Sequence, residues 1–153
     1  MALLGRIIVI IFAVMLASLA AGMAIATGVL GPMVHGFTGD IGERVGFWMV
    51  TFIGASFTGA VGLLPLAILI AIAESFKIRS LLVNALAGAA MLLLGYYGSG
   101  FNRPYEESID SAPPPISREA EIAAAAGAVF GFVYWAIAGR NAGRWRERRQ
   151  PSA

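Results

Sequence analysis

Four long apolar blocks, separated by short polar segments, make up most of this chain of 153 residues. None of the blocks contains a charged side chain; they cover residues 7–30, 47–73, 81–98 and 122–138. A helix that crosses the hydrocarbon core of a bilayer needs about 20 apolar residues. The pattern therefore predicts an all-α polytopic membrane protein, a single membrane domain over residues 1–153, whose four transmembrane helices form an antiparallel bundle.

Residues at the edges of the blocks predict where these helices begin and end. Ser80 and Ser117 are suitable N-caps, because a serine hydroxyl accepts a hydrogen bond from a free backbone N–H. Gly31, followed by proline, ends the first helix. The second helix is long for one crossing, and Pro65 is its expected bend. The helices are therefore expected at about 7–30, 47–73, 81–98 and 119–140.

The first block has an alternative interpretation as a cleaved signal peptide. Arg6 precedes it, and Ala24 to Ala26 form a small-residue pattern suited to cleavage. However, the apolar run is longer than the roughly 7–15 residues typical of a signal peptide. A retained helix is favoured, and cleavage stays open.

The charged residues predict an orientation. They are 13% of the chain, about half their share in soluble domains. With four crossings, only Arg44, Arg103 and Arg118 lie on one side of the membrane. Cytoplasmic segments carry an excess of arginine and lysine, so we expect both termini in the cytoplasm, the protein in the cell inner membrane, and residues 99–121 outside. The eight other cations share the cytoplasmic side: Arg6, Lys77, Arg79, Arg140, Arg144, Arg146, Arg148 and Arg149.

The last residues, 141–153, form a basic cytoplasmic tail. Together with Arg140 at its start, the tail arginines act as a topology signal and can contact anionic membrane lipids; they are Arg144, Arg146, Arg148 and Arg149. Nucleic-acid binding is the more specific alternative. It is not favoured, because Trp145 is the only aromatic residue among these arginines. Membrane lipids are therefore the expected partners, and nucleic acid is not.

Side chains that could carry chemistry are sparse. The chain has no cysteine and one histidine, His35, in a glycine-rich segment. A metal site needs three or four ligands in a fixed geometry, and neither that nor a catalytic grouping can be drawn. We expect no catalytic, cofactor or metal site. Ion-coupled transporters usually carry an ionisable group inside the membrane, and the apolar blocks have none.

Small residues recur at a spacing of four in each block. The second block has Gly54, Thr58 and Gly62, and the fourth has Gly127 and Gly131 after Ala123; weaker pairs are Ser18 with Gly22 and Asn84 with Gly88. Such strips let helix backbones approach closely in lipid. We expect the strips of the second and fourth blocks to face each other, with Phe130 and Tyr134 on the opposite side. Contact with a second copy or another membrane protein stays open.

Glu74 directly follows the second block, on the side where the fourth block leaves the membrane. A lone carboxylate at the membrane edge is costly, so a cation should lie within contact range. The expected partner is Arg140, with Lys77 and Arg79 as alternatives.

Two stretches resemble known sequences. The segments AESFKIRS (Ala73 to Ser80) and YWAIAGRNAGRW (Tyr134 to Trp145) resemble those of small, uncharacterised four-helix inner-membrane proteins of alphaproteobacteria. The resemblance implies a compartment and a topology but no activity. The small multidrug transporters also have four helices, but they depend on a glutamate in the first helix, where this chain has no acid.

These patterns together predict a non-enzymatic integral inner-membrane protein with a structural or accessory role. The alternative is a small membrane transporter or channel. A water-filled path between the helices would favour the alternative, and a sealed apolar bundle would favour the first interpretation.

Overall fold

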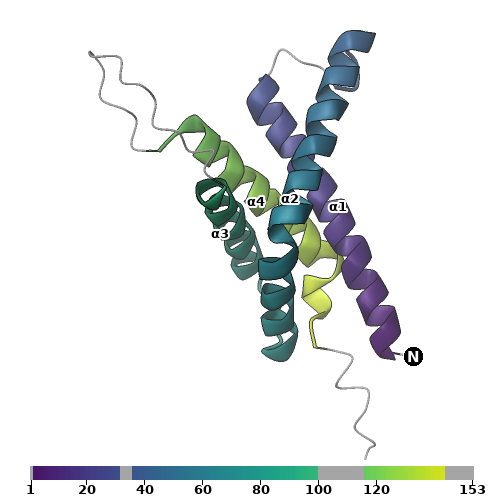
Figure 1. Ribbon diagram of the computed structural model, residues 1–153. Helices are drawn as coiled ribbons and strands as arrows, with labels where there is room; N and C mark the ends of the chain where they lie inside the picture. Colours follow the sequence, from purple (N-terminus) through teal and green to yellow (C-terminus); the bar gives the residue numbers. More distant parts are fainter. Residues whose placement is uncertain (1, 32–35, 100–115, 144–153) are drawn as a thin grey trace, which may run out of the picture.

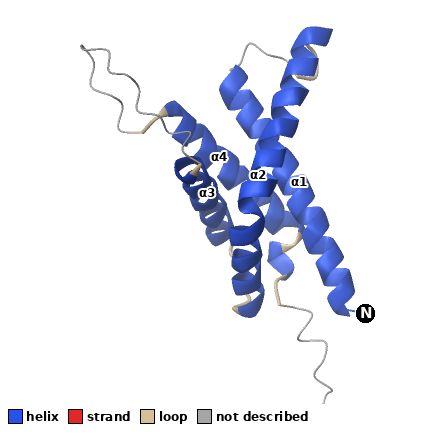
Figure 2. Cartoon of the chain, viewed as in Figure 1, coloured by secondary structure: helices blue, strands red, loops and turns tan. Residues whose placement is uncertain are grey.

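The computed structural model describes residues 2–31, 36–99 and 116–143. Helices account for nearly all of these residues, and no strand occurs among them (Figure 2). The elements are α1 (Ala2–Leu30), α2 (Ile41–Ser75), α3 (Leu81–Gly98), α4 (Arg118–Ile137) and a short 3₁₀ turn, η1 (Gly139–Asn141). The expected all-α class is confirmed for this part of the chain.

Capping side chains start three of the helices. Ser80 and Ser117 accept hydrogen bonds from backbone N–H groups at the starts of α3 and α4, as their positions predicted. Asp40 caps α2 in the same way, accepting from the N–H of Glu43 at 2.8 Å. Because of this cap, α2 begins six residues before the apolar block, at Ile41 rather than residue 47. A cap sets the start of a helix, whereas apolar composition sets only the part that hydrocarbon can cover.

The long helix α2 is bent near its proline. Its segments Ile41–Ala60 and Pro65–Ser75 meet at 65°. Proline has no backbone N–H and its ring clashes with the preceding turn, so it kinks a helix. A straight helix of 35 residues would be about 52 Å long, far more than the ~30 Å hydrocarbon core of a bilayer.

Three described helices, α1, α3 and α4, are long and apolar enough to cross a membrane, and the bent α2 adds a fourth if it counts as one span. Their outer faces are covered by large apolar side chains. Phe12 and Met15 of α1 and Leu86 and Leu94 of α3 are all more than half exposed. Soluble proteins rarely expose apolar patches that extend over whole helices. The helices therefore suit a membrane protein.

The helices alternate in direction along the chain (Figure 1). The start of α1, the end of α2, the start of α3 and the end of α4 lie together at one end. Two close pairs form, α1 with α2 and α3 with α4, and contact between α1 and α4 joins the pairs. The contact between α2 and α3 is much smaller, although the short segment joining them predicts that they are neighbours.

The centre of the core lies where α1 and α4 meet. Alanines of α1 pack there against larger side chains of α4, including Phe130 and Tyr134. These two aromatic residues are only 2% and 5% exposed, so the expectation that they face away from the packed side is wrong. A spacing of three residues is a little less than one helical turn. Phe130 therefore lies on the same face as Gly127, and Tyr134 on the same face as Gly131.

Candidate functional site

The predicted small-residue strip of α4 lies against α3. A Cβ atom added to Gly127 would come within 2.7 Å of the Cα of Ala89, and one added to Gly131 within 2.8 Å of the Cα of Ala85. Gly88 completes this contact, because a Cβ there would lie 3.0 Å from the backbone nitrogen of Gly131. The two backbones touch with no side chains between them. Gly127 and Gly131 thus form a close contact, but with α3 and not with α2 as expected.

The predicted strip of α2 divides between two other helices. Gly54 lies against α1, where an added Cβ would be 3.3 Å from the Cα of Gly22. Gly62 lies near α3, where the same atom would be 3.2 Å from the Cε of Met91. Thr58, between them, is buried and donates to the carbonyl oxygen of Gly54 at 2.8 Å. Since α2 bends between Ala60 and Pro65, its strip cannot follow one partner over its whole length.

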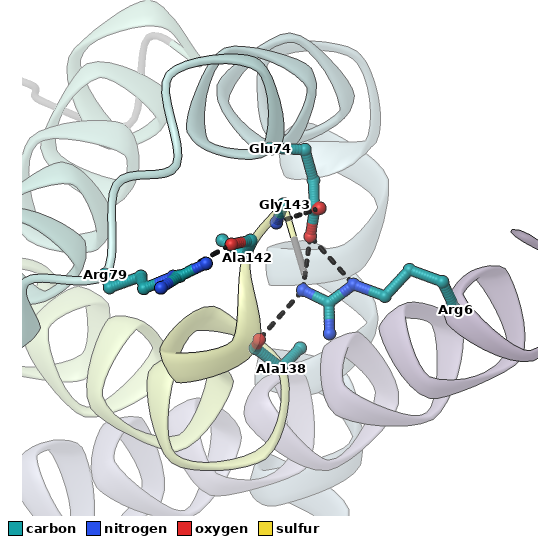
Figure 3. Close-up of polar contacts among 6 residues, drawn as sticks. All are labelled: Arg6, Glu74, Arg79, Ala138, Ala142 and Gly143. Atoms are coloured by element: carbon teal, nitrogen blue, oxygen red, sulfur yellow. Dashed lines mark hydrogen bonds and ion pairs between the residues drawn. The ribbon is translucent and has the colours of Figure 1, made fainter. Parts of the chain in front are cut away.

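Charged and backbone groups from α1, the end of α2, the α2–α3 connection and the chain after α4 meet at one place (Figure 3). The guanidinium of Arg6, in α1, forms an ion pair with Glu74, at the end of α2; its Nε donates at 2.9 Å and its Nη2 binds the same oxygen. Nη2 also donates to the carbonyl oxygen of Ala138 at 2.8 Å. The second carboxylate oxygen of Glu74 accepts from the N–H of Gly143 at 2.8 Å. Both charged side chains are largely buried, 11% and 13% exposed.

A second set of hydrogen bonds ties the α2–α3 connection to the end of α4. The Nε of Arg79 donates to the carbonyl oxygen of Ala142 at 3.0 Å. The indole N–H of Trp135 donates to the carbonyl oxygen of Arg79 at 2.7 Å. We call the whole group the polar clamp; it consists of Arg6, Glu74, Arg79, Trp135, Ala138, Ala142 and Gly143.

Local backbone geometry makes the clamp possible. Helix α2 ends with Lys77 in the left-handed conformation, φ 54°, and the N–H of Ile78 then donates to the carbonyl oxygen of Ala73 at 2.9 Å. This is the hydrogen bond of a Schellman ending, a position where glycine is usual. Gly143 also has a positive φ, 73°, and a Cβ on it would lie 2.7 Å from the Cγ of Lys77. Only glycine lets the chain come this close while its N–H reaches Glu74.

The expected ion pair of Glu74 therefore has a different cation. Arg140 was the predicted partner, but it lies exposed in η1, and Arg6 is the residue that binds the carboxylate. Sequence reasoning favoured Arg140 because it follows the last apolar block directly. Arg6 could have been predicted from the alternating direction of the helices, which places the start of α1 and the end of α2 at the same end of the molecule.

An apolar cavity of about 80 Å³ lies beside the clamp, between α2, α3 and α4. Ile72 and Ala73 line it from α2, Ile78 from the connection and Val83 from α3. Asn84 and Tyr134 are the polar residues in its lining. An open apolar groove of about 620 Å³ lies along α2 and α3, and it has three lining residues in common with the cavity, Leu69, Ala87 and Met91.

The contacts of the clamp fasten α1, the end of α2 and the chain after α4 to one another. One carboxylate oxygen of Glu74 accepts hydrogen bonds from Arg6, and the other accepts from the backbone N–H of Gly143. No group of three or more histidine, aspartate or glutamate side chains that could hold a metal ion occurs among the described residues. His35 and four tail arginines lie outside them: Arg144, Arg146, Arg148 and Arg149.

Comparisons with protein families, curated proteins and solved structures find no match to this chain.

Proposed function

We propose that this chain is a non-enzymatic integral protein of the cell inner membrane with a structural or accessory role. In this proposal its four helices cross the membrane as an antiparallel bundle, and both termini lie in the cytoplasm. The observation that carries the proposal is the separation of charge between the two ends of a helical, otherwise apolar molecule.

The clamp end of the molecule is basic. Its described charges are four cations and one anion, a net charge of +3: Arg6, Lys77, Arg79, Arg140 and Glu74. The other end has two cations and four anions, a net charge of −2: Arg44, Arg118, Asp40, Glu43, Glu119 and Glu121. An excess of lysine and arginine, here four at the clamp end against two at the other, marks the cytoplasmic side of membrane proteins. This distribution supports cytoplasmic termini.

Aromatic residues lie near both ends of the apolar region, where membrane proteins carry their interfacial belts. At the acidic end, the ring of Trp48 lies 5.7 Å from that of Phe37 and 5.9 Å from that of Phe47. Tyr96 and Tyr97 form an edge-to-face pair near the end of α3. At the basic end Trp135 reaches the α2–α3 connection. This placement supports helices that span from one interface to the other.

A structural role is supported by how the polar groups are used. The ion pair of Arg6 and Glu74 joins three parts of the chain rather than opening onto a channel. The cavity beside it is lined almost entirely by apolar side chains, which do not hold water well. A cavity lined by apolar side chains favours an accessory component over a transporter.

Reporter fusions test the topology. A cytoplasm-active reporter should work at both termini, and a periplasm-active reporter should work when fused after Ser99, in the segment expected outside. Activity of the periplasmic reporter at the C-terminus would contradict the proposed orientation. An N-terminal tag on the mature protein would also show that α1 is retained, as its packing against α2 and α4 supports.

Flux measurements test the role. The purified protein in sealed liposomes should conduct protons and small cations no faster than protein-free liposomes of the same lipid. A flux that saturates with the concentration of one ion would instead support the transporter alternative.

A further inference from the structure

The second half of α1 carries a sequence that a signal peptidase can recognise. Ala24 and Ala26 are small residues two positions apart, and they follow a long apolar run that begins directly after Arg6. Small residues spaced in this way, after a cation and an apolar segment, are typical of the site where a signal peptide is cut. The bond that such an enzyme would cut is the amide between Ala26 and Thr27.

The position of this bond along α1 suits an enzyme that works at the membrane surface. About 20 residues separate Arg6 from Ala26, and all of them are helical. At 1.5 Å per residue they span roughly 30 Å, which is also the approximate thickness of the hydrocarbon core of a bilayer. With Arg6 at the cytoplasmic face, Ala26 therefore lies at the opposite face, where signal peptides are removed.

In the folded chain this part of α1 is covered by two other helices. Ala26 itself is fully buried. Gly22, one turn earlier, lies against α2, because a Cβ added to it would be 2.8 Å from the backbone nitrogen of Ala55. Gly28, just after the bond, lies against α4, because a Cβ there would be 2.7 Å from the Cγ1 of Ile122. A peptidase can reach the bond only when α1 separates from these neighbours.

Hydrogen bonds also keep this part of α1 helical. The hydroxyl of Thr27 donates to the carbonyl oxygen of Met23 at 2.8 Å, and the carbonyl oxygen of Thr27 accepts from the N–H of Gly31 at 3.1 Å. The carbonyl oxygen of Gly28 accepts from Nη2 of Arg118, the first residue of α4, at 3.3 Å. Proteases cut segments that are exposed and poorly ordered, so the bond is not a substrate while α1 is packed.

We infer that α1 contains a latent signal-peptidase site between Ala26 and Thr27, which the packing of α2 and α4 protects. The folded protein keeps α1, whereas a chain in which α1 stays apart from its neighbours is cut. In the cut, water adds across the amide bond: its hydroxyl goes to the carbonyl carbon of Ala26, and its hydrogen goes to the nitrogen of Thr27. The inference deepens the proposed function and rests on its orientation, because the site must lie outside the cytoplasm.

Cleavage would remove a segment that the rest of the fold requires. Arg6, the ion-pair partner of Glu74, lies in the released segment, and so do the alanines of α1 that pack in the core. A largely buried carboxylate that loses its cation is strongly unfavourable. The shortened chain therefore cannot rebuild the clamp, and the cut permanently marks a chain that failed to pack.

The test follows the N-terminus of the full chain, made in bacterial cells with a tag at its C-terminus and examined by mass spectrometry. The parent should keep residues 1–26. Gly54→Leu leaves the sequence of α1 unchanged but places a side chain against the backbone of Gly22. It should raise the share of chains that begin at Thr27 roughly tenfold, because cleavage follows the population of the opened state. Gly59→Leu is the matched control in the same helix, since nothing lies within 4 Å of a Cβ added there, and it should stay uncut.

A further variant ties the cut to the recognised residue. Ala26→Leu, combined with Gly54→Leu, leaves the helix contact open but removes the small residue before the bond, so this chain should keep α1. Cleavage that persists in this double variant would overturn the inference, and so would equal retention of α1 in Gly54→Leu and Gly59→Leu. Complete cleavage of the parent would make α1 an ordinary signal peptide and would also overturn it. The reporter fusions measure orientation separately, so a failure of the proposed topology is distinguishable from a failure of this inference.

Discussion

Helix α3 has two antiparallel neighbours along the chain, and it packs against them in opposite ways. Against α4 its backbone touches the partner at Gly88, Gly127 and Gly131, where an added Cβ would overlap backbone atoms. Against α2 it makes contacts through large side chains such as Met91, and a cavity and a groove lie between the helices. The connection between α2 and α3 is much shorter than that between α3 and α4. A short connection therefore does not produce a close contact; small residues on both helices do.

The lipid environment explains the difference. Lipid tails are as apolar as leucine, so burial of leucine or methionine alone gives little drive for two helices to associate. Backbone contact adds many dispersion interactions, each about 0.1–0.2 kcal/mol. Helices α3 and α4 gain these along their shared strip. Helices α2 and α3 do not, and at one end the polar clamp joins both of them to the chain after α4.

The largest expected effect comes from breaking the close contact. Gly127→Leu combined with Gly131→Leu places side chains where backbone atoms of Ala89 and Ala85 lie. The helices must separate, and overpacking costs roughly 1–3 kcal/mol per site. We expect the pair to lose about 3 kcal/mol or more, measured as unfolding free energy in detergent.

A matched pair of leucines on the exposed side of α4 is the control. Ala125→Leu with Val129→Leu has the same spacing of four, and both positions are exposed. This variant should stay within about 0.5 kcal/mol of the parent, as expected for surface substitutions. Equal stability of both double variants would mean that the strip is only a matter of composition.

The next test concerns the clamp, because its polar contacts should stabilise the end of the molecule where α2 and α3 are not closely packed. Glu74→Gln keeps an oxygen for the N–H of Gly143 but leaves Arg6 largely buried without its anion. Removing one partner of a buried ion pair costs roughly 3–5 kcal/mol. With 11% and 13% of these side chains exposed, solvent screening lowers the expectation to about 2 kcal/mol.

A double-mutant cycle separates the ion pair from its surroundings. Arg6→Gln should cost about as much as Glu74→Gln, and the double variant should cost less than the sum, with a coupling energy of about 1 kcal/mol. Arg140→Gln changes an exposed side chain and should have little effect. If Arg140→Gln destabilised the protein as much as Arg6→Gln, the assignment of the ion pair would be wrong.

The sequence predicted elements better than it predicted their partners. Uncharged apolar runs predict helices because a bilayer requires them, and Ser80 and Ser117 cap two of them as expected. The cap at Asp40 was not predicted. The start of this helix was placed where the apolar residues begin, whereas the first turns of α2 are polar. Local patterns of this kind depend on a few adjacent residues, and they can be read from one sequence.

Partners were harder to predict because they depend on how whole helices are placed. The strip at Gly127 and Gly131 could pack against any helix with small residues, and each of the three other blocks contains such residues. The choice of α3 depends on Gly88, which the sequence presented only as a weaker pair with Asn84. Similarly, Glu74 had three nearby cations, and its partner Arg6 lies 68 residues away.

The smallest expected effect distinguishes glycines that belong to a contact from those that do not. Gly46 lies inside α2 with nothing within 4 Å of an added Cβ. Alanine there reduces the backbone freedom of the unfolded chain and creates no overlap, so Gly46→Ala should stabilise the protein by about 0.5–1 kcal/mol. At Gly54, in the same helix, the methyl group of an alanine would lie 3.3 Å from the Cα of Gly22. Gly54→Ala should therefore gain less or lose stability. Thermal unfolding of the two variants side by side measures the difference, and an equal gain in both would mean that α1 and α2 do not approach closely at Gly54.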